Sequence, residues 1–372
     1  MLAVNGRRRT GLVAAGLTAA LTATLPALAT GQDEPAPPPP PIAEPAAEEP
    51  APSPAGVAGE DEGAADSVRG AASALPLPPT SPKPAHLSLH LHGVHHGKVK
   101  VGRKARAVGY LRPFVAKQHV QVKLLRHGHV IQKVNPKARK VRGKNAGRYR
   151  FHSSRLIKPA GYRIVARHVA NSKQERATAR SPRFRIRYPD LDPGDRNSVV
   201  RIFNHLLVHE GYYTTHGKHY SARTEWAVMA FRKVNGMRRT YNANPAIFRK
   251  LADHRGSFNL KYPGAGRHVE VDISRQVMVL ADNGKPKFTF PVSTGAPATP
   301  TIRGHFHFYS RQAGYNSHGM YYSVYFHGGY ATHGYNPVPP YPASHGCVRN
   351  PIPDSRFIYN WIRLGESIYV YG

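Results

Sequence analysis

Ser344-His345-Gly346-Cys347-Val348-Arg349-Asn350 is the stretch from which the chain is best interpreted, because Cys347 is the only cysteine in 372 residues. A lone thiol cannot form an internal disulfide, so it is either incidental or a working group. Gly346 has no Cβ, which permits a sharp turn that leaves the amides of residues 345–347 free to face a ligand. Such amides beside a thiol are the components of an oxyanion hole next to a nucleophile. His333, upstream, can take the thiol proton if the fold brings it near.

These residues resemble the signature of a known enzyme family. His333-Gly334 followed by Ser344-His345-Gly346-Cys347-Val348-Arg349 is similar to the motif of the L,D-transpeptidases, whose catalytic domain is of the YkuD type. Further resemblances, over roughly residues 263–372, are Val292-Ser293-Thr294-Gly295, Thr299-Pro300-Thr301 and Gly365-Glu366-Ser367-Ile368-Tyr369-Val370. Gly334 is a departure, because some members have Ser or another side chain there. Any group that orients His333 is then expected to be a backbone carbonyl or a more distant residue.

The resemblance assigns catalytic roles. It implies Cys347 as the nucleophile and His333 as the base and later the acid. The implied oxyanion donors are the backbone amides of His345, Gly346 and Cys347. Losing one such donor typically costs about 10²–10³ in rate. A papain-like peptidase is disfavoured, because there the histidine follows the cysteine, and no histidine follows Cys347 here.

A zinc site is the rival hypothesis for the thiol. It would need three or four converging ligands. The histidines available to it are His305, His307, His318, His327, His333 and His345. Their spacing matches no metal motif, so we expect neither a metal nor a cofactor.

Aromatic side chains crowd the approach to the motif. They are Tyr315, Tyr321, Tyr322, Tyr325, Phe326, Tyr330 and Tyr341. Packing within a sheet accounts for some of them, and the others are expected to line a cleft for a peptide stem. The resemblance makes Tyr322 and Phe326 candidate substrate contacts. Arg349 is expected either to contact a substrate carboxylate or to brace the loop through an internal salt bridge.

The charge of the chain is unevenly distributed. The formal net charge is +32, and residues 86–188 alone carry +26, with 27 Lys or Arg and one acid, Glu175. This excess indicates an anionic partner, namely nucleic acid, an acidic membrane or a polyanionic wall polymer, or else a solvated basic surface. The N-terminal segment, which is predicted below to be an export signal, argues against nucleic acid.

The N-terminus has the pattern of an export signal. Arg7-Arg8-Arg9 precede an apolar run that ends in Ala27-Leu28-Ala29, so residues 1–29 are predicted to be a signal peptide cleaved near Ala29. An uncleaved anchor helix and twin-arginine export are the alternatives. Residues 30–84 are rich in Pro, Ala and Glu, which predicts a disordered linker suited to reaching through a thick wall. We therefore expect an extracytoplasmic, wall-associated protein.

Residues 85–188 alternate apolar and polar side chains with period two. Short strands separated by Gly and Pro predict a small immunoglobulin-like β-sandwich. The apolar sets are Leu87, Leu89 and Leu91; Val120, Val122 and Leu124; Tyr162, Ile164 and Ala166; and Phe184, Ile186 and Tyr188. Arg183, Arg185 and Arg187 alternate with the last set and are expected to face solvent.

Residues 189–262 change to helical periodicity and are predicted to form a small three-helix domain. The first helix is expected from Asn197 to Glu210, with Val199, Ile202, Phe203 and Leu206 on one face. Ser221 is expected to cap the second helix and Asn244-Pro245 to open the third.

The helical segment resembles a peptidoglycan-binding domain. The matching features are Leu191-x-x-Gly194-Asp195, Leu207-x-x-x-Gly211-Tyr212 and Thr224-x-x-Ala227-Val228-x-x-Phe231. Asn204 and Arg232 depart from it, because glutamine is common at both positions, and His216–Tyr220 replace its usual turn. A helical spacer is the alternative interpretation.

Residues 263–372 are predicted to be a mostly β catalytic domain. Strands are expected over residues 268–273, 276–280 and 288–292, with Asp282-Asn283-Gly284-Lys285 as a hairpin turn. A short helix is expected over residues 354–364 and a last strand over residues 367–370.

The resemblance implies an exported L,D-transpeptidase that forms 3→3 peptidoglycan cross-links through a thioacyl-enzyme on Cys347. Water in place of the acceptor amine would give an L,D-carboxypeptidase acting on the same stems. The competing hypothesis is a non-catalytic wall-binding protein, against which the intact Cys347, His333 and Gly346 argue. The expected partners are peptidoglycan stem peptides and, for residues 85–188, anionic wall polymers.

Overall fold

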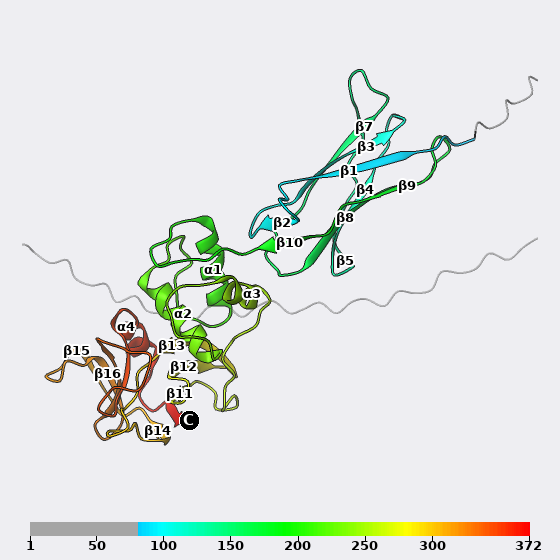
Figure 1. The fold of residues 1–372 in the computed structure, drawn as a ribbon. Helices are drawn as coiled ribbons and strands as arrows, with labels where there is room; N and C mark the ends of the chain where they lie inside the picture. The colour runs from blue at the N-terminus through cyan, green and yellow to red at the C-terminus, as the bar shows by residue number, and fades with distance from the viewer. Residues whose placement is uncertain (1–80) are drawn as a thin grey trace, which may run out of the picture. The chain divides into compact units, whose positions relative to one another are not determined.

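The computed structural model describes residues 81–372 (Figure 1). The predicted signal peptide and nearly all of the predicted linker lie outside the described residues, so these two predictions stay untested. Four helices and nineteen strands make up the described chain. Within residues 81–372, no helix has both the length and the hydrophobicity needed to span a membrane.

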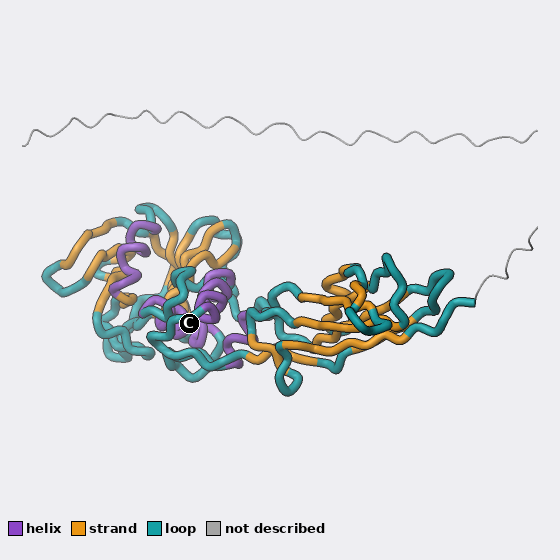
Figure 2. Tube along the Cα trace, turned by 90° about the horizontal axis from the view of Figure 1, so that it is seen from above, coloured by secondary structure: helices purple, strands orange, loops and turns teal. Residues whose placement is uncertain are grey.

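Two sheets form the β-rich part that begins the described chain, which Figure 2 draws as strands and loops. The first sheet has the order β1 (His86–His92), β3 (Arg106–Arg112), β7 (Gly147–His152) and β6 (Arg139–Lys140). The second has the order β2 (Lys98–Lys100), β10 (Phe184–Arg187), β8 (Gly161–His168), β4 (Gln121–Arg126) and β5 (His129–Val134), with β9 (Ala177–Arg180) paired to β8.

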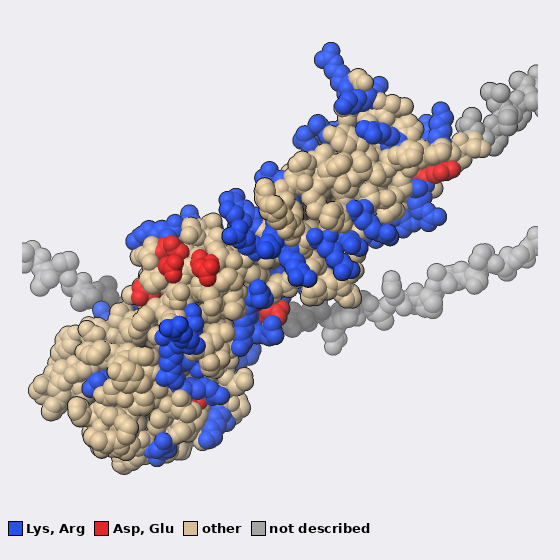
Figure 3. All heavy atoms as spheres, in the orientation of Figure 1, with Lys and Arg blue, Asp and Glu red and all other residues tan. Residues whose placement is uncertain are grey.

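The two sheets share one hydrophobic core. Leu111 and Phe151 come from the first sheet, while Val122, Leu124 and Ile164 come from the second, and all five are buried. Period-two alternation explains this, because every second side chain of a strand faces the same side. The three arginines of residues 183–187 are exposed, as expected, and Figure 3 shows Lys and Arg side chains spread over this part. The immunoglobulin-like topology stays a prediction.

Three helices follow, α1 (Ser198–His209), α2 (Ala222–Val234) and α3 (Pro245–Ala252). Asn197 caps α1 with a side chain that accepts from the amides of Val199 and Val200. Asn244 caps α3 in the same way, with Pro245 at the first helical position, where its missing N–H costs nothing. The helices share a core, but the assignment of a peptidoglycan-binding domain stays a prediction.

Two helix predictions need correction. The buried face of α1 contains Val200, Phe203 and Leu207, so the predicted face was displaced by one residue; Val199 is only half-buried. Ser221 stands before α2, but its side chain makes no capping hydrogen bond and its hydroxyl is buried without a partner.

The two departures from the peptidoglycan-binding pattern have structural roles. The Asn204 amide donates to the carbonyls of Gly217 and His219, at 3.0 and 3.3 Å, and so braces the unusual turn. The Arg232 guanidinium donates to the carbonyl of Asn242 at 2.7 Å. Both side chains are buried, so they are committed to the fold rather than presented to a glycan.

Two further sheets and one helix form the rest of the chain. The five-stranded sheet has the order β13 (Lys285–Pro291), β12 (Val277–Asp282), β11 (His268–Asp272), β19 (Ser367–Tyr371) and β14 (Gly304–His307). The four-stranded sheet has the order β15 (Ser310–Tyr315), β16 (Tyr321–His327), β17 (Tyr330–Tyr335) and β18 (Val348–Pro351), and α4 (Ile352–Trp361) follows β18. Asn283 and Gly284, at φ +52° and +67°, form the predicted hairpin turn.

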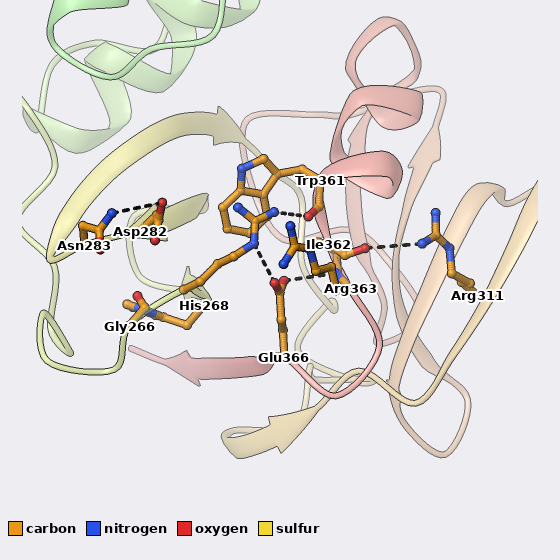
Figure 4. A network of polar contacts seen from close by, with 10 residues as sticks. Gly266, His268, Asp282, Asn283, Arg311, Trp361, Ile362, Arg363 and Glu366 are labelled. Carbon is orange, nitrogen blue, oxygen red and sulfur yellow. Dashed lines mark hydrogen bonds and ion pairs between the residues drawn. The ribbon is translucent and has the colours of Figure 1, made fainter. Parts of the chain in front are cut away.

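Glu366, from the Gly365–Val370 motif, joins the beginning of this region to its end (Figure 4). Its carboxylate accepts from Nε of Arg267 at 2.6 Å and from the amide of Arg363 at 3.0 Å. The Arg267 guanidinium also lies 3.5 Å from the centre of the Trp361 ring. The motif therefore closes the fold around β11 and β19, which pair in parallel.

Candidate active site

Two adjacent parallel strands bring the candidate catalytic residues together. His333 lies on β17, where it is paired in register with Arg349 of β18. Cys347 immediately precedes β18, two residues before Arg349. The turn between β16 and β17 lies against the thiol, since Sγ of Cys347 is 3.5 Å from the carbonyl oxygen of Gly329. The register thus brings the segments that carry His333 and Cys347 side by side at the beginning of β18.

The Val292–Gly295 and Thr299–Thr301 motifs hold the cysteine loop in place. The amides of Ala343 and Ser344 donate to the carbonyl of Thr294, at 2.8 and 2.9 Å. The Thr301 hydroxyl donates to the carbonyl of Gly346 at 2.7 Å and accepts from the amide of Gly295 at 2.8 Å. Through these hydrogen bonds, the two motifs position the backbone around Cys347.

Glycine is required at the loop's turn. Gly346 has φ +114°, and a Cβ there would lie 2.9 Å from the Tyr330 ring. This conformation is costly for other residues, so the turn predicted from Gly346 is confirmed.

The oxyanion prediction needs a correction. The Gly346 amide donates to the Ser344 hydroxyl at 3.1 Å, so it is not free for a ligand. Within residues 81–372, the amides of His345 and Cys347 have no acceptor. The turn was predicted to leave all three amides free, but a serine hydroxyl two residues earlier in the chain competes for one of them. Two donors, not three, are available.

The His333 ring is held in one tautomer by its own strand. Its Nδ1 lies 3.0 Å from the carbonyl oxygen of Gly334, which can only accept, so Nδ1 carries the proton and Nε2 carries the lone pair. This is the backbone carbonyl expected as the orienting group. Burial lowers the pKa of His333 to about 4, with a contribution from the positive charge of Arg349. At neutral pH, the imidazole is therefore a neutral proton acceptor.

The Cys347 thiol is protonated at rest. Burial raises its pKa above the ordinary value, against smaller lowering effects of the Ala331 backbone and the Arg349 charge. The resting pair is thus a neutral thiol beside a neutral imidazole. A thiolate has to be generated by proton transfer when the substrate is bound.

A chain of polar contacts explains the glycine after His333. The Ser355 hydroxyl of α4 donates to Oδ1 of Asn350 at 2.7 Å, and the Asn350 amide donates to the Thr332 hydroxyl at 3.1 Å. A Cβ at Gly334 would lie 2.1 Å from the Ser355 hydroxyl oxygen. Ser355 thus fills the space that a side chain at position 334 would need.

Arg349 does not brace the loop through a salt bridge. Its guanidinium lies 4.2 Å from the centre of the Tyr335 ring, and no carboxylate of residues 81–372 is within ion-pair distance of it. Stacking on an aromatic face leaves the edge of a guanidinium available for hydrogen bonding. Of the two expectations for Arg349, the contact with a substrate carboxylate is the one compatible with this arrangement.

The two predicted aromatic contacts have different surroundings. Phe326 is only 3% exposed and packs in the core near Phe308 and Tyr330, so its predicted substrate contact is wrong. Tyr322 is half-buried at φ +52°, with its ring 5.0 Å from that of Tyr359 on α4. Tyr330 lies beside Gly346, where an added Cβ would be 2.9 Å from its ring.

The rival zinc site finds no ligand set around the thiol. In the part of the chain that the structure describes, Cys347 belongs to no group of three converging histidine, cysteine or carboxylate ligands. His305 and His307 are exposed on β14, and the His305 ring stacks on that of Tyr369.

Two residues near the thiol were not identified as site residues from the sequence, Gly329 and Thr301. Gly329 was signalled only by a Gly-Gly turn, and Thr301 only by a motif without an assigned role.

Comparison with known proteins places these residues in a family context. The family model that describes the L,D-transpeptidase catalytic domain (YkuD) matches residues 266–370. Among solved structures, the chain is similar to an L,D-transpeptidase from Xylanimonas cellulosilytica, with 27% identity over 49% of this chain and 98% of that chain and a TM-score of 0.45. It is also similar to an L,D-transpeptidase from Stackebrandtia nassauensis, with 22% identity over 49% of this chain and 94% of that chain and a TM-score of 0.31.

Comparison with curated proteins found no match. The family match lies within the predicted range of residues 263–372 and contains both candidate catalytic residues. Residues 266–370 therefore form a mostly β catalytic domain of the L,D-transpeptidase type.

Proposed function

We propose that the protein is an exported cysteine L,D-transpeptidase that forms 3→3 peptidoglycan cross-links. The observation that carries the proposal is the loop before β18, where the amides of His345 and Cys347 have no acceptor among residues 81–372. The thiol of Cys347 lies in this loop, near a histidine whose Nε2 carries the lone pair of a neutral base. This arrangement suits acyl transfer through a covalent thioester, because that chemistry needs a nucleophile, a base and stabilisation of an oxyanion.

Acylation begins with the substrate in place. Nε2 of His333 takes the proton of the Cys347 thiol, and Sγ attacks the carbonyl carbon of the third residue of a tetrapeptide stem, at the L-centre of its diamino acid. The carbonyl electrons move to oxygen, where the amides of His345 and Cys347 stabilise the negative charge. The oxyanion then collapses and breaks the C–N bond. The His333 imidazolium protonates the departing amine, terminal D-alanine leaves, and a thioester remains on Cys347.

Deacylation reverses these roles. His333, neutral again, takes a proton from the side-chain amine of a second stem as that amine attacks the thioester. The C–S bond breaks, the thiolate regains its proton from His333, and the new amide is the 3→3 cross-link. Water in place of the amine would release a free acid, which is the L,D-carboxypeptidase alternative.

The surroundings of the enzyme are part of the proposal. The N-terminal pattern supports export, and the charge of +26 on residues 86–188 supports attachment to an anionic wall polymer. A wall-bound enzyme would keep its catalytic domain near its substrate at high local concentration.

The test is intact-mass spectrometry of the full chain mixed with a disaccharide-tetrapeptide. We expect a covalent adduct that lacks D-alanine, followed by a cross-linked dimer when a second stem is supplied. The Cys347→Ala variant should melt at the same temperature and form neither product. Wild-type-like products from this variant would rule out the thioester, whereas an adduct that only hydrolyses would favour the carboxypeptidase.

A further inference from the structure

A cluster of three side chains in the helical region has no role in the catalysis described above. His209 and Glu210 lie at the C-terminal end of α1, and His254 follows α3. Nδ1 of His209 and Nδ1 of His254 lie 3.0 and 3.3 Å from the same carboxylate oxygen, Oε1 of Glu210. The two nitrogens are 3.2 Å from each other. Three potential donor atoms thus form a nearly equilateral triangle.

Hydrogen bonding alone does not account for this triangle. Each imidazole has one proton to share when it is neutral, so at most two of the three separations are hydrogen bonds at once. If both nitrogens donate to Glu210, their protons face each other across the third side. A single cation at the centre would satisfy the lone pairs of all three atoms.

The dimensions suit a tetrahedral metal ion. Zinc binds histidine nitrogen and carboxylate oxygen at about 2.0–2.2 Å, so neighbouring ligands of a tetrahedral site lie about 3.3–3.6 Å apart. The longest of the three separations, 3.3 Å, is at the lower end of this range, and the other two, 3.0 and 3.2 Å, fall just below it. Two nitrogens and one carboxylate oxygen are also donors that zinc accepts.

The surroundings hold the ligands in position. Glu210 is only 4% exposed, and its second oxygen, Oε2, accepts from the Ser257 hydroxyl. A ligating carboxylate is typically oriented by such an outer hydrogen bond. His254 has φ +53°, the left-handed conformation that ends α3, and the amide of Arg255 closes this helix end by donating to the carbonyl of Lys250 at 3.0 Å. The side chain of His209 is 62% exposed, which gives an ion access from solvent.

We propose that His209, Glu210 and His254 form a binding site for one Zn²⁺ ion, with the fourth position open to water. The ion would tie the end of α1 to the segment after α3. Its effect would extend toward the catalytic domain, because Gly211, the next residue after Glu210, accepts from the amide of Thr289 on β13 at 2.7 Å. No sequence motif signals this site, since His254 follows Glu210 by 44 residues.

The chain contains a matched control for this proposal. His205, on the same helix α1, pairs with His216, with Nδ1 atoms 3.0 Å apart. The ring centres are 4.4 Å apart in both histidine pairs. The His205–His216 pair has no carboxylate in a ligand cluster among residues 81–372. It should therefore bind zinc much more weakly.

The experiment uses the full chain in a Cys347→Ala background, so that the thiol cannot take up metal. The protein is stripped with a chelating resin, loaded with zinc sulfate and gel-filtered, and bound zinc is measured by plasma mass spectrometry. We expect one tightly retained zinc ion per chain and a melting temperature that rises by several degrees with zinc. His209→Ala and His254→Asn, the latter chosen because Asn tolerates positive φ, should lose both effects, whereas His205→Ala should keep them.

Cobalt substitution supplies a second readout that does not depend on stability. Co²⁺ in a four-coordinate site with these ligands should give intense visible absorption bands, and these should disappear in His209→Ala. The proposal is overturned if the His209 and His254 variants retain as much zinc as the parent. It is also overturned if His205→Ala loses zinc equally, or if the parent retains none after gel filtration.

Discussion

Replacing His333 by Ala tests how the thiol is activated. Because burial raises the pKa of Cys347 above the ordinary value of about 8.5, less than about 3% of the thiol is ionised at pH 7 without a base. Acylation by His333→Ala should therefore fall by about 10²–10⁴ at pH 7, the usual contribution of a general base. The variant should then recover about tenfold per pH unit up to the pKa of the thiol, since only the thiolate reacts.

The wild-type enzyme should show a different pH profile. The pKa of His333 is lowered to about 4, so the base is lost only as the pH falls through that value. We expect a nearly flat acylation rate from about pH 5 to pH 8. The assay is rapid-quench intact-mass spectrometry with a disaccharide-tetrapeptide, and iodoacetamide alkylation gives the thiol pKa independently.

His345→Ala is the matched control for this prediction. The His345 ring is exposed, and only the backbone amide is assigned a role, so this variant should lose much less activity. Greater damage from His345→Ala than from His333→Ala would mean that the two roles are exchanged. An alkylation midpoint below pH 7 in the wild type would show a preformed thiolate and refute the neutral pair.

Three further predictions concern the loop, the interior and the basic part of the chain. Thr301→Val removes the hydroxyl that pairs with the Gly295 amide and the Gly346 carbonyl, and should destabilise the fold by about 1–3 kcal/mol for each backbone group that it leaves unpaired. It should also slow acylation. Thr301→Ser should restore the stability, measured by denaturant titration, and the acylation rate, measured by mass spectrometry. Burial lowers the pKa of Lys233 to about 7, so between pH 7 and 10 its amine binds a proton only in the unfolded chain. The free energy of unfolding should therefore rise with pH in this range, by up to about 1.4 kcal/mol per pH unit. Lys233→Met should lack this rise, and an equal slope in both proteins would contradict the assignment. Cys347→Ala protein should sediment with purified walls at low salt and dissociate as salt increases, and a variant that lacks residues 86–188 should not; equal binding to walls stripped of anionic polymer would identify the charge as a solvated surface.

Local signals in the sequence predicted local structure well. Asn283-Gly284 formed a hairpin turn because both residues tolerate positive φ. Asn244 opened the third helix as predicted, because its side chain reaches amides two and three residues ahead. Asn197, predicted as the first helical residue, caps α1 in the same way, whereas Ser221, the predicted cap of α2, makes no capping hydrogen bond. Gly346 adopted the turn conformation for which its missing Cβ is needed. In each case, the determining contact lies within a few residues of the signal.

The incorrect predictions concern features that tertiary contacts determine. The helical period identifies an apolar face but not which of its residues are most deeply buried, so the buried face of α1 was misplaced by one residue. Phe326 and Tyr322 are both aromatic residues on β16, and only the packing of the second sheet layer buries Phe326. The Ser344 hydroxyl took the Gly346 amide, a choice that depends on the turn's exact shape. Export and the signal peptide stay predictions.

The contact between Gly334 and Ser355 has an evolutionary consequence. A side chain at position 334 would collide with the Ser355 hydroxyl at 2.1 Å, so the two positions are not free to vary independently. Converting Gly334 to Ser should be deleterious alone and tolerated only with a smaller residue at position 355. This coupling is a form of epistasis that a double-mutant cycle would measure. A change beside His333 is then expected to be accompanied by a change on α4, the helix that follows Cys347.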